Sequence, residues 1–161
     1  MRTALIIALF LLWMPLQGAF GADIVSEARK ELGHGETGSD NKGKYVRLYT
    51  NGIESSWCAG FVSYVLKKSG NNQFGYILSA KAYWNKAKKM KLTTKTPKKG
   101  YLIVFWRDNP QSWKGHIGIV EKVEGDIITT IEGNTGNFPS VVKRKKYNIK
   151  KIDKLLGYIK I

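Results

Sequence analysis

The order of helical and strand patterns along the chain predicts an α+β protein, with N-terminal helices packed on a C-terminal antiparallel sheet. Apolar residues recur at three- and four-residue spacing in the first ninety residues, as on the buried face of a helix. After residue 100 the chain instead contains runs of β-branched and aromatic residues separated by short turns. Helices followed by strands, without regular alternation, favour this class over an alternating α/β fold.

Three helices are expected. The first covers residues 23–32, with Asp23 as N-cap and Gly33 as the end signal. The second follows Ser55 or Ser56 as N-cap, runs to Gly70, and presents an apolar face of Trp57, Phe61, Tyr64 and Val65. The third runs over residues 79–90, with an inward face of Ala80, Tyr83, Trp84 and Ala87 and five outward lysines between residues 81 and 91.

The strands are expected in the second half of the sequence, after a linker over residues 93–99. A hairpin turn at Gly125 joins two of them, and the glycine- and asparagine-rich residues 133–137 are expected to form a turn. Residues 34–43, which are also glycine-rich, are expected to form a loop. The predicted strands are 101–106, 116–123, 127–132, 140–147 and 155–161.

The first 21 residues have the composition of a secretory signal peptide. One positive charge at Arg2 precedes an apolar run from Ala4 to Leu16, and small residues stand at Ala19 and Gly21. The apolar run is shorter than the roughly 20 residues of a membrane-spanning helix. We therefore expect a signal peptide over residues 1–21, a domain over residues 22–161, no stable membrane insertion, and export to the periplasm or the extracellular cell wall.

The chain is strongly basic, with 27 Lys and Arg residues against 12 Asp and Glu residues and a formal net charge of +15. Removal of residues 1–21 takes away Arg2 and no acid, which leaves 26 − 12 = +14. An exported cation of this strength is drawn to anionic polymers, and we expect the partner to be peptidoglycan in the cell wall. No nucleic-acid motif is present, so no nucleic-acid partner is expected, and a monomer is expected.

Cys58 is the only cysteine, and it stands in the first turn of the second predicted helix. A lone cysteine cannot form an intrachain disulfide in an oxidising compartment, so its presence there calls for another role. Unpaired N–H groups and the positive end of the helix dipole stabilise a thiolate at such a position, which points to a nucleophile. The alternative is a buried structural cysteine.

A cysteine nucleophile needs a base, and the base needs a third group to orient it. His116 opens a predicted strand at a loop boundary, where its ring can face a cleft. Glu132 and Asn134 lie near the end of the next strand of the same hairpin, which sets a polar side chain across from the imidazole. His34 is the alternative base, but its glycine-rich loop gives it no fixed scaffold.

These motifs resemble the CHAP domain (cysteine, histidine-dependent amidohydrolase/peptidase), in the NlpC/P60-like group of papain-related folds. The resemblance rests on residues 57–62 around the cysteine, Pro97-x-x-Gly100 before an apolar strand, residues 115–120 around the histidine, and Glu132-Gly133-Asn134. It implies that Cys58 is the nucleophile, His116 the general base, Glu132 the orienting residue, and Asn134 a further polar member of the catalytic site.

Two residues depart from the pattern of that family. Tyr101 stands where an aspartate usually follows the Pro-x-x-Gly motif, and Trp57 stands where many members have glutamine. Some members carry a calcium loop upstream of the cysteine, but Glu36 and Asp40 are too few acids to form one. We expect neither a metal nor another cofactor.

The resemblance implies an exported peptidoglycan hydrolase that cleaves an amide bond by a Cys-His-Glu mechanism. The bond would be the N-acetylmuramoyl-L-alanine amide or a peptide bond of the stem or bridge, and the sequence does not distinguish an amidase from an endopeptidase. Two alternatives stay open: a catalytically silent cationic wall-binding protein, and a secreted antibacterial effector that uses the same chemistry.

Overall fold

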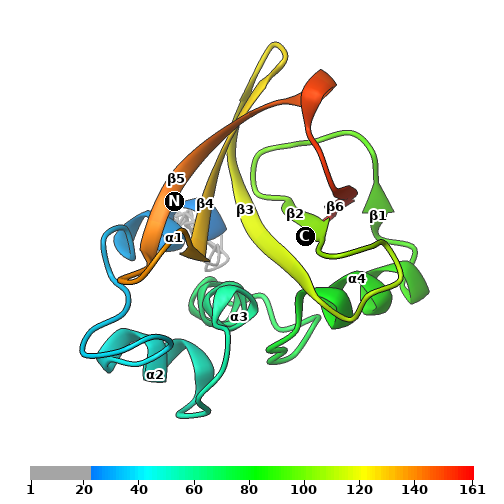
Figure 1. Ribbon diagram of the computed structural model, residues 1–161. Helices are drawn as coiled ribbons and strands as arrows, with labels where there is room; N and C mark the ends of the chain where they lie inside the picture. Colours follow the sequence, from blue (N-terminus) through cyan, green and yellow to red (C-terminus); the bar gives the residue numbers. More distant parts are fainter. Residues whose placement is uncertain (1–22) are drawn as a thin grey trace, which may run out of the picture.

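The computed structural model describes residues 23–161, and its centre is one antiparallel sheet of six strands (Figure 1). The spatial order of the strands is β1-β6-β2-β3-β4-β5, so the C-terminal strand lies between the first two. The predicted signal peptide lies outside the described residues. The strands are β1 (Thr93–Thr94), β2 (Leu102–Trp106), β3 (Gly115–Glu124), β4 (Ile127–Thr135), β5 (Val141–Asn148) and β6 (Leu155–Ile159).

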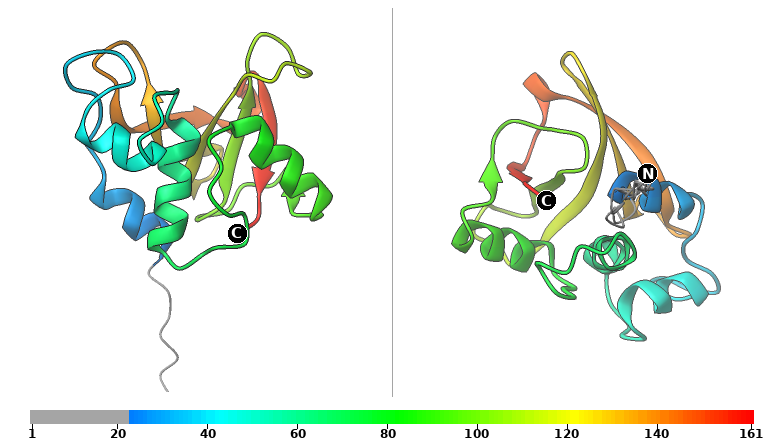
Figure 2. Two further views of the ribbon diagram at one scale, coloured as in Figure 1. Left: turned by 90° about the horizontal axis from the view of Figure 1, so that it is seen from below. Right: turned by 180° about the vertical axis from the view of Figure 1, so that it is seen from behind.

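Four α-helices gather on one side of this sheet, as the views from below and behind show (Figure 2). The predicted N-cap of the first helix is confirmed, because the Asp23 side chain accepts a hydrogen bond from the N–H of Val25. The helix ends earlier than predicted, at Lys30 with Glu31 as C-cap, and the N–H of Gly33 bonds to Val142. A short 3-10 helix at Ile149–Lys151 joins β5 to β6. The α-helices are α1 (Ile24–Lys30), α2 (Lys44–Thr50), α3 (Cys58–Lys68) and α4 (Ala80–Lys89).

Helix α3 packs against β3 and β4 and is the central helix of the fold (Figure 1). Its residues Trp57, Phe61 and Val65 are buried, as the apolar spacing predicts. Gly60 permits close contact with α2, because a Cβ at this position would lie 2.3 Å from the carbonyl oxygen of Tyr49. Gly70 follows the helix with φ +80, which confirms it as the end signal.

Three local expectations are wrong. Neither Ser55 nor Ser56 caps α3: the N-cap is Trp57, which makes no side-chain capping bond. Part of the predicted linker over residues 93–99 is the edge strand β1, which pairs with β6. The predicted turn over residues 133–137 begins as strand, because β4 continues through Thr135 after an irregularity in its pairing with β5.

The sheet separates two apolar clusters, because successive side chains of a strand point to opposite faces. Leu102 and Val104 of β2 belong to the main core with the helices, whereas Ile103 and Phe105 belong to a smaller cluster with Tyr158 of β6. The chain therefore covers part of the second face of the sheet as well. Within residues 23–161, no helix is both long enough and apolar enough to cross a membrane.

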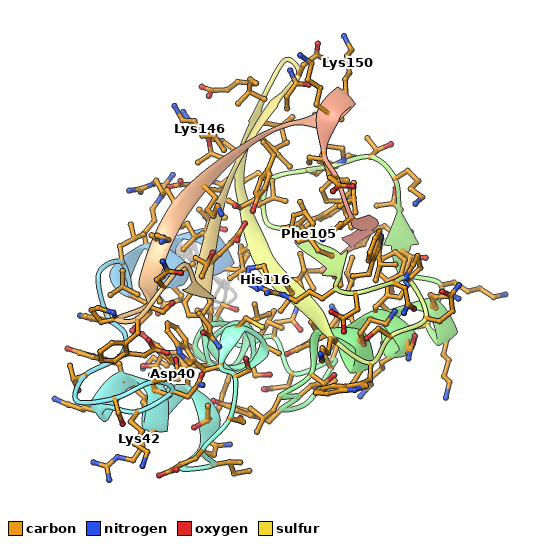
Figure 3. The ribbon with its side chains drawn as sticks, viewed as in Figure 1. Asp40, Lys42, Phe105, His116, Lys146 and Lys150 are labelled. Carbon is orange, nitrogen blue, oxygen red and sulfur yellow. The ribbon has the colours of Figure 1, made fainter. Side chains whose placement is uncertain are left out.

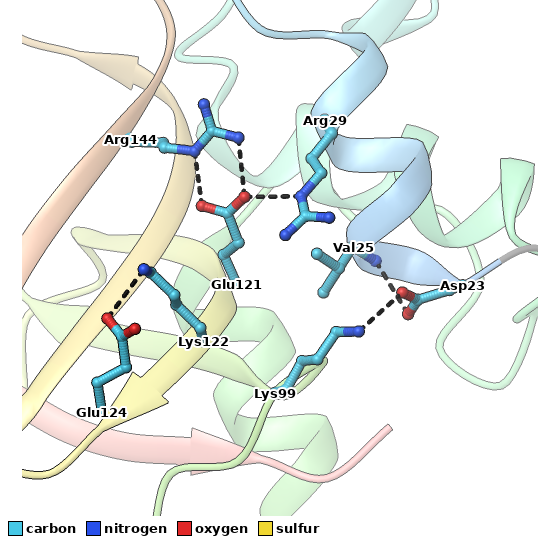
Figure 4. A network of polar contacts seen from close by, with 8 residues as sticks. All are labelled: Asp23, Val25, Arg29, Lys99, Glu121, Lys122, Glu124 and Arg144. Carbon is cyan, nitrogen blue, oxygen red and sulfur yellow. Dashed lines mark hydrogen bonds and ion pairs between the residues drawn. The ribbon is translucent and has the colours of Figure 1, made fainter.

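A buried carboxylate ties α1 to the sheet. The pairing of β3 with β4 shifts between Val120 and Lys122, and Glu121 stands at this irregularity with only 3% of its side chain exposed. Its carboxylate accepts hydrogen bonds from Arg29 of α1 at 2.7 Å and from Arg144 of β5 at 2.7 and 2.8 Å (Figure 4). The two guanidinium groups, that of Arg144 first, outweigh burial and hold the pKa of Glu121 below its usual value.

We expect Glu121→Gln to lower the free energy of unfolding by about 1–3 kcal/mol at neutral pH, because the two arginines lose their shared anion. The pKa of Glu121 is depressed in the folded state, so its stabilisation is present above the unfolded pKa and is lost as pH falls through the folded pKa. Urea unfolding of both proteins at neutral and acidic pH measures this difference, which should shrink in acid.

The matched control is Glu124→Gln in the same strand, because Glu124 is 61% exposed and pairs only with Lys122. Exposed pairs of this kind contribute about 0–1 kcal/mol. Equal effects of the two substitutions would contradict the role assigned to Glu121.

Candidate active site

The fold brings Cys58 and His116 together from separate elements. Cys58 is the first residue of α3, and His116 is the second residue of β3, which packs on that helix. Figure 3 shows His116 above α3, near the middle of the molecule. Both residues line one cleft of about 750 Å³, and each is only 7% exposed. The thiol and the imidazole thus share one partly enclosed cleft that is open to solvent.

Glu132 is the residue that bonds to the imidazole. His116 Nε2 donates to Glu132 Oε2 at 2.9 Å, since a carboxylate can only accept. The other ring nitrogen, Nδ1, is buried and has no hydrogen-bond partner within residues 23–161, which leaves it for the neighbouring thiol. Glu132 itself is fully buried, so this contact is shielded from water.

Gly118 makes this contact geometrically possible. The pairing of Ile119 with Ile131 sets Gly118 opposite Glu132, and His116 lies two residues along on the same face of β3. A Cβ at position 118 would lie 2.5 Å from Glu132 Cγ. Because Gly118 has no side chain, Glu132 has room to extend diagonally from β4 to His116.

Two hydroxyl groups fix the second oxygen of the same carboxylate. Thr130 Oγ1 donates to Glu132 Oε1 at 2.6 Å, and the Tyr147 hydroxyl donates to it at 2.9 Å. Phe105 packs beside this group, with ring centroids 6.2 Å from His116 and 5.3 Å from Tyr147. No sequence motif indicates these three residues, although strand alternation places Tyr147 and Thr130 on one face once the β4–β5 register is known.

The electrostatics favour an ion pair between Cys58 and His116. Burial disfavours the thiolate, but interaction with His116 and the backbone N–H groups of Ile117 and Ala59 outweighs it, so the pKa of Cys58 is lowered. Burial also disfavours the imidazolium, but its interactions with Cys58 and Glu132 raise the pKa of His116 to about 9. For Glu132, burial is likewise outweighed by His116, Thr130 and Tyr147, and its pKa is lowered.

Asn134 lies in the cleft but bonds to other partners. Its amide donates to Ser56 Oγ at 3.0 Å and to Asn41 Oδ1 at 3.4 Å, and its φ of +52 is left-handed. Asn134 thus holds the segment before Cys58, and Glu132 contacts the histidine.

Two further residues singled out in the sequence have structural contacts. Glu36 accepts hydrogen bonds from Trp57 Nε1 at 3.1 Å and from the N–H of Ser140 at 2.6 Å, which ties the residue before Cys58 to the start of β5. His34 does have a scaffold, contrary to expectation: its Nδ1 bonds to Glu31 at 3.0 Å and its ring stacks on Tyr45 at 3.8 Å.

The architecture is that of the papain-related, NlpC/P60-like class: helices on an antiparallel sheet, with a cysteine at a helix start beside a histidine and a glutamate on neighbouring strands. The chain belongs to the CHAP-domain family, whose model matches residues 49–134. This match covers Cys58, His116, Glu132 and Asn134.

Solved structures share the fold at low sequence identity. The crystal structure of Ly7917 is 17% identical with a TM-score of 0.54, and Ly7917 with the hydrolysing product of MDP is 17% identical with a TM-score of 0.55. Both comparisons cover 86% of this chain and 61% of Ly7917, so the chain spans about three fifths of that protein's length. A comparison with curated proteins gives no match.

A third structure is a lipoprotein-like NLP/P60 family protein from Staphylococcus aureus subsp. aureus Mu50, at 17% identity and a TM-score of 0.48. That comparison covers 86% of this chain and 40% of the other.

We expect Gly118→Ala to lower the pKa of His116 from about 9 toward the ordinary value of 6.5, because the new methyl group displaces the Glu132 carboxylate from Nε2. Titration of the imidazole by NMR measures this shift. Glu132→Gln should lower the pKa in the same direction, since it removes the charge and leaves Gly118 in place. An unchanged pKa in a folded Gly118→Ala protein would contradict the role of Gly118.

Proposed function

We propose that this protein is an exported cysteine amidase or peptidase that hydrolyses an amide bond of peptidoglycan through Cys58, His116 and Glu132. The single observation that carries the proposal is the buried bond from His116 Nε2 to Glu132, beside a thiol whose pKa is lowered by the same histidine. Membership of the CHAP-domain family supports the reaction class. Residues 1–21 supply the export signal in this proposal.

In the first half of the reaction, the Cys58 thiolate attacks the carbonyl carbon of the scissile amide. The bond from sulfur to carbon forms, and the carbonyl oxygen becomes negatively charged. The N–H of Cys58 lies in the first turn of α3, where backbone N–H groups have no partner within the helix and can stabilise that oxygen. The His116 imidazolium then gives its Nδ1 proton to the departing amine, and a thioester remains.

In the second half, the now neutral His116 takes a proton from water through Nδ1, and the hydroxide attacks the thioester carbonyl. The carbon–sulfur bond breaks, the acid product leaves, and the thiolate–imidazolium pair is restored. Glu132 holds the ring in the tautomer with a proton on Nε2 throughout. Thr130, Tyr147 and Phe105 act as positioning residues, because they fix the carboxylate and the ring without reaching the substrate.

Charge supports peptidoglycan as the substrate class. The net charge of +15 attracts an anionic polymer, and Arg107, Lys114 and Lys145 line the cleft that holds Cys58. Trp113, which is 79% exposed at the same cleft, offers a flat apolar surface to a bound chain. Both an N-acetylmuramoyl-L-alanine amide and a peptide bond of the stem fit this description.

We expect Cys58→Ala to abolish the lysis of purified sacculi, with rates at least about 10³-fold below the parent protein, because no other group can form the thioester. Turbidity reports lysis, mass spectrometry of released fragments reports the bond, and far-UV circular dichroism checks the fold. Undiminished lysis would disprove the nucleophile. A parent protein that binds sacculi and releases no fragment would favour the silent wall-binding alternative.

We expect a bell-shaped dependence of kcat/KM on pH. Activity rises as Cys58 ionises at a pKa below its ordinary 9.0, and falls as His116 loses its proton near pH 9. Glu132→Gln should move the alkaline limb to lower pH, because loss of the carboxylate lowers the pKa of His116. Initial rates on a soluble peptidoglycan fragment test this, and an alkaline limb that stays in place would argue against Glu132 as the partner of the base.

A further inference from the structure

Two cations, Arg107 and Lys145, line the cleft that contains Cys58 and His116. Strand alternation places Lys145 on the same face of β5 as Tyr147, and the Lys145 Nζ lies 6.0 Å from the centre of that ring. Arg107 directly follows β2, two residues after Phe105. Burial and the neighbouring Glu132 raise the pKa of the Tyr147 phenol, and the positive charge of Arg107 acts in the opposite direction.

Neither cation is neutralised by the protein. Within residues 23–161, no carboxylate forms an ion pair with Arg107 or Lys145, and neither side chain donates a hydrogen bond. The nearest acid of the site, Glu132, is fully buried, and its oxygens already accept from His116, Thr130 and Tyr147. Lys114, the third cation of the cleft, differs because it pairs with Asp108 at 3.0 Å.

Many other cations of residues 23–161 also have no carboxylate partner, and it is their position in the cleft that sets Arg107 and Lys145 apart. Arg144, the neighbour of Lys145 on β5, points to the opposite face and pairs with Glu121, and Lys150 pairs with Asp126. The residues that line the cleft include no aspartate or glutamate at all. Two like charges in one cleft repel each other, and a bound anion reduces this repulsion. The pair therefore has the features of an anion site beside the nucleophile.

We propose that Arg107 and Lys145 bind a carboxylate of the substrate next to the scissile amide, so that the enzyme selects an acidic stem peptide over its amidated counterpart. This inference rests on the proposed function, since it places the anion site within the same cleft. A guanidinium presents two parallel N–H donors that match the two oxygens of a carboxylate, and a lysine adds a second positive charge. A carboxamide at the same position offers one acceptor and no charge.

The test uses binding, measured by titration calorimetry on the full-length Cys58→Ala protein, so that no probe is consumed. The probes are two synthetic stem peptides of identical sequence that differ only in one glutamyl α-carboxyl group, which is free in one and amidated in the other. We expect the free acid to bind about tenfold more tightly. Raising the ionic strength should reduce the difference, because both cations reach solvent.

Arg107→Gln and Lys145→Gln, each added to Cys58→Ala, should remove most of the preference for the free acid and leave binding of the amidated peptide nearly unchanged. Lys146→Gln is the matched control, because Lys146 is the next residue of β5, is exposed and points outward to the opposite face (Figure 3). This control should retain the full preference. Far-UV circular dichroism on each variant checks that the fold is kept.

Equal affinities for the two peptides, or a preference that survives both substitutions, would overturn the proposal. Salt-sensitive binding of a glycerol phosphate polymer in the absence of any peptide preference would assign the cations to a wall polyanion, and would overturn it too. The hydrolase assignment is tested separately on the protein with Cys58 intact. A preference for the acidic peptide without product release would support the carboxylate site and contradict the hydrolase activity. Lysis without a preference for the acidic peptide would support the hydrolase activity and contradict the carboxylate site.

Discussion

The site depends on one buried hydrogen bond, from His116 Nε2 to Glu132. This bond fixes the tautomer of the ring, leaves Nδ1 for Cys58, and supplies the negative charge that keeps the imidazolium protonated against the cost of burial. A buried carboxylate is stable only if its oxygens are satisfied, which explains why Thr130 and Tyr147 bond to it. The three ionisable groups therefore hold one another in the charged state.

The backbone of the sheet is shaped around this bond. Gly118 gives Glu132 the room to reach across from β4 to β3, and Gly60 lets α3 lie against the carbonyl of Tyr49. Behind the active site, Glu121 stands at the irregularity between β3 and β4 and joins α1 to β5 through two arginines. The elements α3, β3 and β4, which carry Cys58, His116 and Glu132, are thus held relative to one another by contacts on both sides, as the proposed chemistry requires.

The excess of positive charge has two different uses in the molecule. Several exposed cations neutralise acids nearby, as Lys122 does for Glu124. Arg107 and Lys145 instead face the cleft without a carboxylate partner in the part of the chain that the structure describes. These two positive charges lie in the same cleft as Cys58, where the proposed carboxylate of the substrate would bind.

The sequence by itself determined the fold class, the first and last residues of α1 and α4 to within a few positions, and the positions of the main strands along the chain. It could do so because helix caps and apolar spacing are local signals. It also singled out Cys58, His116 and Glu132. Only the tertiary structure decided that Glu132, and not Asn134, contacts the imidazole. It also showed that Ser56 accepts a hydrogen bond from Asn134 and does not cap α3. It alone revealed Tyr147 and Thr130, since their role follows from strand register. Turn geometry and the apolar pattern specify the register of regular pairing. The irregularities between Val120 and Lys122 and between Glu132 and Thr135 shift that register, and only the folded sheet shows them.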